Sequence, residues 1–246
     1  MFVHLTTHSA YSLQEGLALP ADLAQAAQAD GMPALGLTDH RLLSGSVEFV
    51  LACREAGVQP LLGLEIDLEN GPLALLAMNM GGWSNLCRLC SLLALRDDPA
   101  ATCPLDLLMP CSADLIALYD PRRDPAGKES GLLREIFPDR LYLTLQDPAH
   151  SLPVADFGRR LSLPLVVAHP VYYLSPNQAA LQKTLAAIRL NCPIERLPDG
   201  AAAPTGAYFV NSREIESRFK GSRAASRQGT RDGRRASVCL LLPHAG

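Results

Sequence analysis

Two histidines and two glutamates early in this sequence have side chains of the kind that hold divalent metals. They are His8, Glu15, His40 and Glu65. Phosphodiester hydrolysis needs a nucleophilic hydroxide and positive charge near the phosphate, and paired divalent cations held by carboxylates and imidazoles supply both. A lone surface histidine or glutamate is far more common than a metal ligand. The chemistry therefore depends on whether the fold brings these four residues together.

The sequence predicts strands that would place these donors along one edge of a sheet. Short apolar runs alternate with helical patterns, which is typical of parallel βα units. We expect strands at 2–5, 34–38, 58–66, 73–78, 114–119, 140–145 and 165–168. We expect helices at 20–30, 46–56, 83–95, 154–161 and 175–190, and mostly loops at 97–128. Seven strands favour a barrel with its chemistry on the C-terminal rim, and an open doubly wound sheet is the alternative.

Composition favours one main globular domain. The chain has 246 residues, 48% of them hydrophobic, and a formal charge of −3, so any contact with DNA must be local or supplied by a partner. The start lacks a signal-peptide pattern, and no run approaches ~20 apolar residues, so we expect no membrane segment and a cytoplasmic location. Seven irregularly spaced cysteines favour reduced thiols. Cys87 and Cys90 lack a second pair at zinc-finger spacing, which favours core packing on a helix.

Three segments resemble the PHP domain (polymerase and histidinol phosphatase) found at the N-terminus of bacterial DNA polymerase III alpha subunits. They are VHLTTHSAYSLQEG, MPALGLTDH and VQPLLGLEIDL. The resemblance covers 2–219 and implies an α/β fold, a PHP-type distorted (β/α)7 TIM-like barrel. It also implies metal-ligand roles for His8, Glu15, His40 and Glu65. Asp39, beside His40, would be an orienting carboxylate.

Five of the nine ligand positions implied by this resemblance carry other residues here. They are Thr6, Pro72, Pro121, Pro170 and Tyr172. Proline has no side-chain donor, whereas Thr6 keeps a weak hydroxyl. His169 is next to Pro170, so Thr6 and His169 are candidate accessory donors. The resemblance therefore implies at most one weakly held divalent ion, Zn²⁺, Mn²⁺ or Mg²⁺, in place of a three-metal cluster.

The implied role is structural and docking, within a replicative DNA polymerase. Its partners would be the remaining polymerase domains or replisome subunits such as a proofreading exonuclease, and DNA would be contacted indirectly. No segment resembles a polymerase palm, so the chain alone is not expected to polymerise DNA. One alternative is a free-standing metal-dependent PHP phosphoesterase or 3′–5′ exonuclease, against which the five lost donors count. The other is an interaction module with no metal dependence.

The composition changes after residue 219, where we place the end of the PHP domain. The segment KGSRAASRQGTRDGRR has six basic residues, one acidic residue and no large apolar side chain. This pattern predicts disorder for 220–246. The segment does not resemble the continuation of alpha subunits. A frameshift after Phe219 is therefore the favoured hypothesis, and a DNA-binding arm is the alternative.

Overall fold

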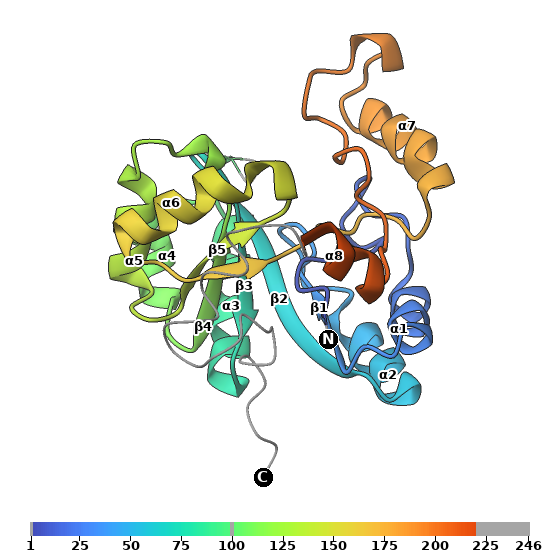
Figure 1. The fold of residues 1–246 in the computed structure, drawn as a ribbon, viewed down its shortest axis with the longest axis horizontal. Coiled ribbons are helices and arrows are strands. Elements are labelled where there is room, and N and C mark those ends of the chain that lie inside the picture. The colour runs from blue at the N-terminus through green and yellow to red at the C-terminus, as the bar shows by residue number, and fades with distance from the viewer. Residues whose placement is uncertain (1, 99–100, 220–246) are drawn as a thin grey trace.

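The computed structural model describes residues 2–98 and 101–219. Its centre is a six-stranded sheet in which the strands follow one another in chain order (Figure 1). The strands are β1 (Ala34–Leu37), β2 (Gln59–Leu68), β3 (Gly71–Ala77), β4 (Leu115–Tyr119), β5 (Leu141–Leu145) and β6 (Leu165–Val167). Each lies at a predicted strand, and helices separate most of them, so the α/β prediction is confirmed.

One strand of this sheet runs against its neighbours, which the prediction of parallel βα units did not include. β3 is antiparallel to both β2 and β4, whereas the other neighbouring pairs are parallel. Only Glu69 and Asn70 separate β2 from β3. Two residues can form a hairpin turn but cannot form the crossover that parallel strands require. The dipeptide Asn70-Gly71 was the sequence signal for this hairpin.

The predicted strand at 2–5 is wrong as a regular strand. Its backbone bonds to β1 at Gly36, whose N–H donates to the His4 carbonyl at 2.8 Å. The next bond runs from the Thr38 N–H to the Thr7 carbonyl at 2.9 Å. The two hydrogen bonds are two residues apart along β1 (Gly36 to Thr38) but three residues apart along the N-terminal segment (His4 to Thr7). The extra residue in the N-terminal segment interrupts the regular strand pairing.

The same N-terminal segment also reaches the chain that follows β6. The His8 N–H donates to the Val171 carbonyl at 2.8 Å, and the Val171 N–H donates to the Thr6 carbonyl at 3.0 Å. The six strands therefore form a curled half-barrel whose two edges are joined through residues 4–8 by isolated hydrogen bonds. This arrangement replaces the predicted seven-stranded barrel.

Both faces of the curled sheet are buried. Along β3, Leu73 and Leu75 belong to a large apolar cluster that also contains residues from the helices, while Ala74 and Leu76 belong to a smaller one inside the curl. The members of the smaller cluster are Val3, Leu5, Ala34, Ala74, Leu76, Ile116, Leu118 and Val166. Alternate side chains of a strand point to opposite faces, so β3 is apolar on both. The N-terminal segment helps to fill the interior of the curl.

Eight α-helices surround the sheet in the described ranges. They are α1 (Pro20–Ala29), α2 (Ser46–Ala56), α3 (Met80–Ala94), α4 (Leu105–Leu108), α5 (Lys128–Ile136), α6 (Ser151–Leu161), α7 (Ala179–Arg189) and α8 (Ser212–Phe219). The predicted set lacked α4, α5 and α8, and the 97–128 loop prediction was wrong where α4 lies. Figure 1 shows α5 and α6 at one end of the sheet, α1 and α2 at the other, and α7 standing out from the body.

Two helix boundaries follow the predicted local signals. Gly57 ends α2 with a φ of 69°, a left-handed conformation that glycine adopts without steric cost. Ser175 opens a short 3-10 turn (Pro176–Gln178) before α7, and the Gln178 side chain accepts from the Ser175 N–H at 3.1 Å, as in a capping box. These ends depend on local geometry, which explains why they could be predicted.

The cysteine pair lies on α3, as predicted. Cys87 and Cys90 are half-buried free thiols, and Cys90 Sγ donates to the Arg41 carbonyl at 3.3 Å. Burial raises the pKa of both thiols. Leu86 and Leu89 beside them are fully buried, so the pair lies at the border of the core.

Two further predictions concern the chain as a whole. The tail at 220–246, predicted to be disordered or frameshifted, lies outside the described residues. Across 2–98 and 101–219, no helix is both long and apolar enough to cross a membrane.

Candidate metal centre

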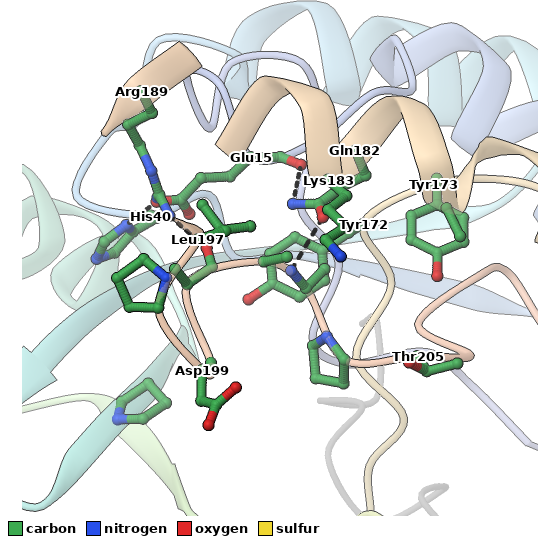
Figure 2. Close-up of a pocket in the computed structure, with 18 of the residues that line it drawn as sticks. Glu15, His40, Tyr172, Tyr173, Gln182, Lys183, Arg189, Leu197, Asp199 and Thr205 are labelled. Atoms are coloured by element: carbon green, nitrogen blue, oxygen red, sulfur yellow. Dashed lines mark hydrogen bonds and ion pairs between the residues drawn. The ribbon is translucent and has the colours of Figure 1, made fainter. Parts of the chain in front are cut away.

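The fold brings the four predicted donors to one edge of the half-barrel. His40 follows β1 and forms an isolated backbone bridge to Glu65 on β2. Glu15 Oε1 lies 3.0 Å from His40 Nδ1, and His8 Nε2 lies 3.5 Å from Glu65 Oε2. A cavity of about 860 Å³ opens beside them, lined by Glu15, His40 and Glu65 among others (Figure 2). We call it the rim cavity.

Asp39 fixes the loop at 9–16, which carries Glu15. Its carboxylate is buried and accepts from the Ser9 N–H at 2.7 Å and from the Ser12 hydroxyl at 2.8 Å. The Ser12 oxygen in turn accepts from the His40 N–H at 3.0 Å. The Asp39 carboxylate therefore bonds directly to the loop at 9–16, and it positions the His40 backbone indirectly, through Ser12.

Gly16 closes this loop tightly against the chain. A Cβ at Gly16 would lie 2.1 Å from the Ser9 carbonyl oxygen and 2.8 Å from the His8 carbonyl oxygen, so backbone would have to move. We expect Gly16→Ala to lower the free energy of unfolding by about 2 kcal/mol, measured by urea denaturation. Gly131→Ala on α5 is the control, because a Cβ there meets nothing within 4 Å. Equal stability of Gly16→Ala and wild type would contradict this tight packing.

His40 is held between two carboxylates. Nδ1 lies 3.0 Å from Glu15 Oε1, and Nε2 lies 2.8 Å from Asp67 Oδ2. Burial lowers the pKa of His40, but the hydrogen bond to Asp67 and the charges of Asp67 and Glu65 outweigh it, so the pKa is raised. A carboxylate at each ring nitrogen and the raised pKa both favour the imidazolium form, in which each nitrogen carries a proton. Neither nitrogen then has a lone pair for a metal.

Two arginines also pair with these carboxylates. Arg41 Nη2 lies 2.8 Å from Asp67 Oδ2, and Arg41 Nε donates to the same oxygen at 3.0 Å. Burial raises the pKa of Asp67, but its bonds to His40 and Arg41 outweigh this and hold the pKa below its usual range. The Arg189 guanidinium contacts Glu15 Oε1. The positive charge at this edge therefore comes from protein side chains.

His8 keeps a ring nitrogen that is not hydrogen-bonded within the described residues. Its ring is fully buried and stacks on Tyr172, with ring centroids 4.1 Å apart and an interplanar angle of 5°. Nε2 has no hydrogen-bond partner in the described part of the chain. Burial, then the charges of Glu65 and Asp67, raise the pKa of Tyr172 well above its ordinary value, so Tyr172 is a neutral phenol.

The two candidate accessory donors bond elsewhere. The Thr6 hydroxyl donates to the His169 carbonyl at a long 3.4 Å. His169 Nε2 donates to the Tyr208 carbonyl at 2.9 Å, and its ring faces His4. The Thr6 side chain thus links the N-terminal segment to His169, and the His169 side chain links to Tyr208.

The residues present do not fit the implied metal cluster. Within the described residues, no group of three or more His, Cys, Asp or Glu side chains is placed to hold a metal ion. Pro72 and Tyr172 line the rim cavity, and Pro121 is buried at the start of a 3-10 turn. What remains is the His8 Nε2 and Glu65 pair, which offers an ion two protein ligands.

Three residues of this site were absent from the predicted donor set. Asp67 lies two residues after Glu65 on β2, so both side chains point to the same face, and this alternation was the missed signal. Arg189 and Gln182 come from α7, and 174 residues separate Arg189 from Glu15. No local pattern connects residues so far apart.

Comparison with known proteins agrees with the sequence motifs. The PHP domain family matches residues 4–148. An error-prone DNA polymerase of Symbiobacterium thermophilum is 36% identical, over 76% of this chain and 21% of the relative. The DNA polymerase III subunit alpha of Escherichia coli K12 is 32% identical, over 72% and 18%. An amidohydrolase structure from Chromobacterium violaceum aligns at 14% identity with a TM-score of 0.48, covering 88% of this chain and 96% of the other.

The chain spans about a fifth of the length of the curated relatives it matches. Its family match covers more than half of the 246 residues and includes His8, Glu15, His40, Glu65 and Asp67. The chain belongs to the PHP domain family and is homologous to the N-terminal region of DNA polymerase III alpha subunits and error-prone DNA polymerases.

Proposed function

We propose that this chain serves as the PHP module of a DNA polymerase III alpha-type polymerase and that its role is structural and docking. The observation that carries the proposal is the commitment of the rim side chains to one another. Both ring nitrogens of His40 face carboxylates, and Glu15 and Asp67 each contact an arginine as well. A hydrolytic centre would use Glu15 and His40 as metal ligands, and here both pair with other protein side chains.

The partners in this proposal are the remaining polymerase domains and replisome subunits such as a proofreading exonuclease. DNA is contacted indirectly, through those partners, in keeping with the formal charge of −3. Nucleotidyl transfer belongs to the parts of the relatives that this chain does not span. A replication role of this kind implies a cytoplasmic location.

A residual metal-dependent phosphoesterase or 3′–5′ exonuclease is the second candidate. The unpaired His8 Nε2, 3.5 Å from Glu65 Oε2 beside the rim cavity, is the observation that favours it. These two side chains would hold one Zn²⁺, Mn²⁺ or Mg²⁺ weakly. A single ion would leave the attacking and leaving oxygens of a phosphodiester without the paired clamp.

Metal content and hydrolysis together test the proposal. We expect the purified 246-residue chain, dialysed against Mn²⁺, Zn²⁺ or Mg²⁺, to retain well below one ion per chain by elemental analysis. We also expect no release of p-nitrophenol from its phosphate ester, and no 3′ trimming of single-stranded DNA, above the level of a His8→Ala variant. One ion per chain, lost in His8→Ala together with hydrolysis, would establish the second candidate instead.

Docking is tested separately by gel filtration with the proofreading exonuclease subunit of the same organism. Co-elution of the two purified proteins is the expected result. Independent elution at micromolar concentrations of both would contradict the docking role.

A further inference from the structure

The α7 helix supplies a positive charge to the candidate metal centre from outside the sheet. Figure 2 shows Arg189, the last residue of α7, reaching towards Glu15 and His40. Its guanidinium contacts Glu15 Oε1, the same oxygen that faces His40 Nδ1 at 3.0 Å. Glu15 is largely buried, with 12% of its side chain exposed. A carboxylate in that position needs a counter-charge.

The same guanidinium joins three separate parts of the chain. Arg189 Nη2 donates to the Ala201 carbonyl at 2.7 Å, while its other terminal nitrogen, Nη1, contacts Glu15 in the loop at 9–16. About two helical turns closer to the start of α7, Gln182 Nε2 donates to the Glu15 carbonyl at 3.3 Å. Gln182 Oε1 accepts from the Ala203 N–H at 3.0 Å. Seven residues separate Gln182 from Arg189, so both lie on the helix face that meets the rim.

The guanidinium of Arg189 bonds through its two terminal nitrogens and leaves Nε without a bond to any described residue. Arg189 Nε is buried without a hydrogen-bond partner in the described part of the chain. An arginine near a helix C-terminus can bond to the last carbonyls of its own helix while its Nε stays exposed to water. Here one N–H is left unpaired while the terminal nitrogens reach Glu15 and Ala201. Contact with the rim carboxylate explains this geometry.

We propose that Arg189 acts as a built-in counter-cation that replaces metal charge at Glu15 and fastens α7 across the rim cavity. Arg189 is a positioning residue: it holds Glu15 and, through it, His40 in a metal-free arrangement. This inference rests on the proposed non-hydrolytic function. It adds that the loss of metal ligands is compensated by one side chain from α7.

A double-mutant cycle on the full chain tests the charge pairing. We expect Arg189→Gln to lower Tm by about 4 °C in buffer with EDTA, because the Glu15 carboxylate keeps its charge and loses one of its two partners in the described ranges, with only His40 left. In a Glu15→Gln background the same substitution should cost less than half as much. Arg54→Gln, a last-turn arginine on exposed α2 surface, is the matched control. Equal Tm losses in both backgrounds would overturn the proposal, as would a loss no larger than that of the control.

Manganese gives a readout that packing alone would not change. With the counter-cation removed, we expect Mn²⁺ at millimolar concentration to raise the Tm of Arg189→Gln and to leave wild type and Arg54→Gln unchanged. A Mn²⁺ response that is equal in all three proteins, or absent from all three, would contradict the counter-cation role. Hydrolysis by the wild type would contradict the proposed function. The Tm values of the double-mutant cycle test the role of Arg189 separately from that function.

Discussion

Asp39→Ala is expected to lower the free energy of unfolding by about 4 kcal/mol and to release the loop at 9–16. Asp39 is 1% exposed and accepts from the Ser9 N–H at 2.7 Å and from the Ser9 and Ser12 hydroxyls at 2.8 Å. Alanine would leave these three buried donors unpaired. Each such donor typically costs 1–3 kcal/mol, and neighbouring losses are not fully additive, hence a total of about 4 kcal/mol.

Urea denaturation measures the loss in the free energy of unfolding, and amide hydrogen exchange shows which part of the chain is loosened. The amides of the 9–16 loop should exchange much faster in Asp39→Ala, because the Ser9 N–H loses its acceptor and the Ser12 hydroxyl loses the carboxylate that holds it. Asp39→Asn keeps one acceptor oxygen and should lose less than half as much stability. Asp156→Ala is the surface control, since its pairing with Arg159 is exposed. Exchange in the 9–16 loop that matches wild type would refute this account of Asp39.

The second large effect is a loss of stability in mild acid that depends on His4. The His4 ring is fully buried, and its Nε2 donates to the Val210 carbonyl at 2.8 Å. Burial lowers the pKa of His4 from 6.5 to about 4; the Val210 bond opposes this and the His169 charge adds to it. Burial likewise lowers the pKa of His169. Both rings are therefore neutral in the folded protein at neutral pH.

The sign of the effect follows from where the proton binds. Between pH 6.5 and about 4 the unfolded chain protonates His4 and the folded chain does not, so acid favours unfolding. The contribution is fully present above pH 6.5, falls as the pH drops, and levels off below about 4. The loss from His4 alone amounts to about 3 kcal/mol at pH 4.

His4→Gln is the matched variant for this titration. Glutamine can donate to the Val210 carbonyl and does not titrate, so the variant should lose less stability than wild type between pH 6.5 and 4. Groups that do not interact with His4 titrate equally in both proteins, so the difference between the two urea-denaturation curves reports His4 together with its coupling to His169. Parallel curves across that window would show that His4 is not the group responsible. An NMR titration of the His4 ring should show it neutral until about pH 4.

Local signals account for the parts of the fold that could be predicted. The alternation of apolar strands and helical segments, the Gly57 stop and the Ser175 start depend on residues close in sequence, and the structure reproduces them. The antiparallel β3 also had a local signal, in Asn70-Gly71, but the expectation of a repeating parallel unit outweighed it. The irregular segment at 2–5 had no such signal. Its extra residue, between the carbonyls that bond to Gly36 and Thr38, becomes apparent only when the segment pairs with β1 in the folded chain.

The sequence by itself determined which donors are present, which family positions lack them, and that His40 follows a strand end. The tertiary structure alone decided what those donors bond to. The imidazolium of His40 between Glu15 and Asp67, and the guanidinium of Arg189 on Glu15, join residues as far as 174 positions apart. Side-chain types and local propensities can be read from short segments of sequence. Charge pairing depends on distances between side chains, and those distances exist only after the whole chain has folded.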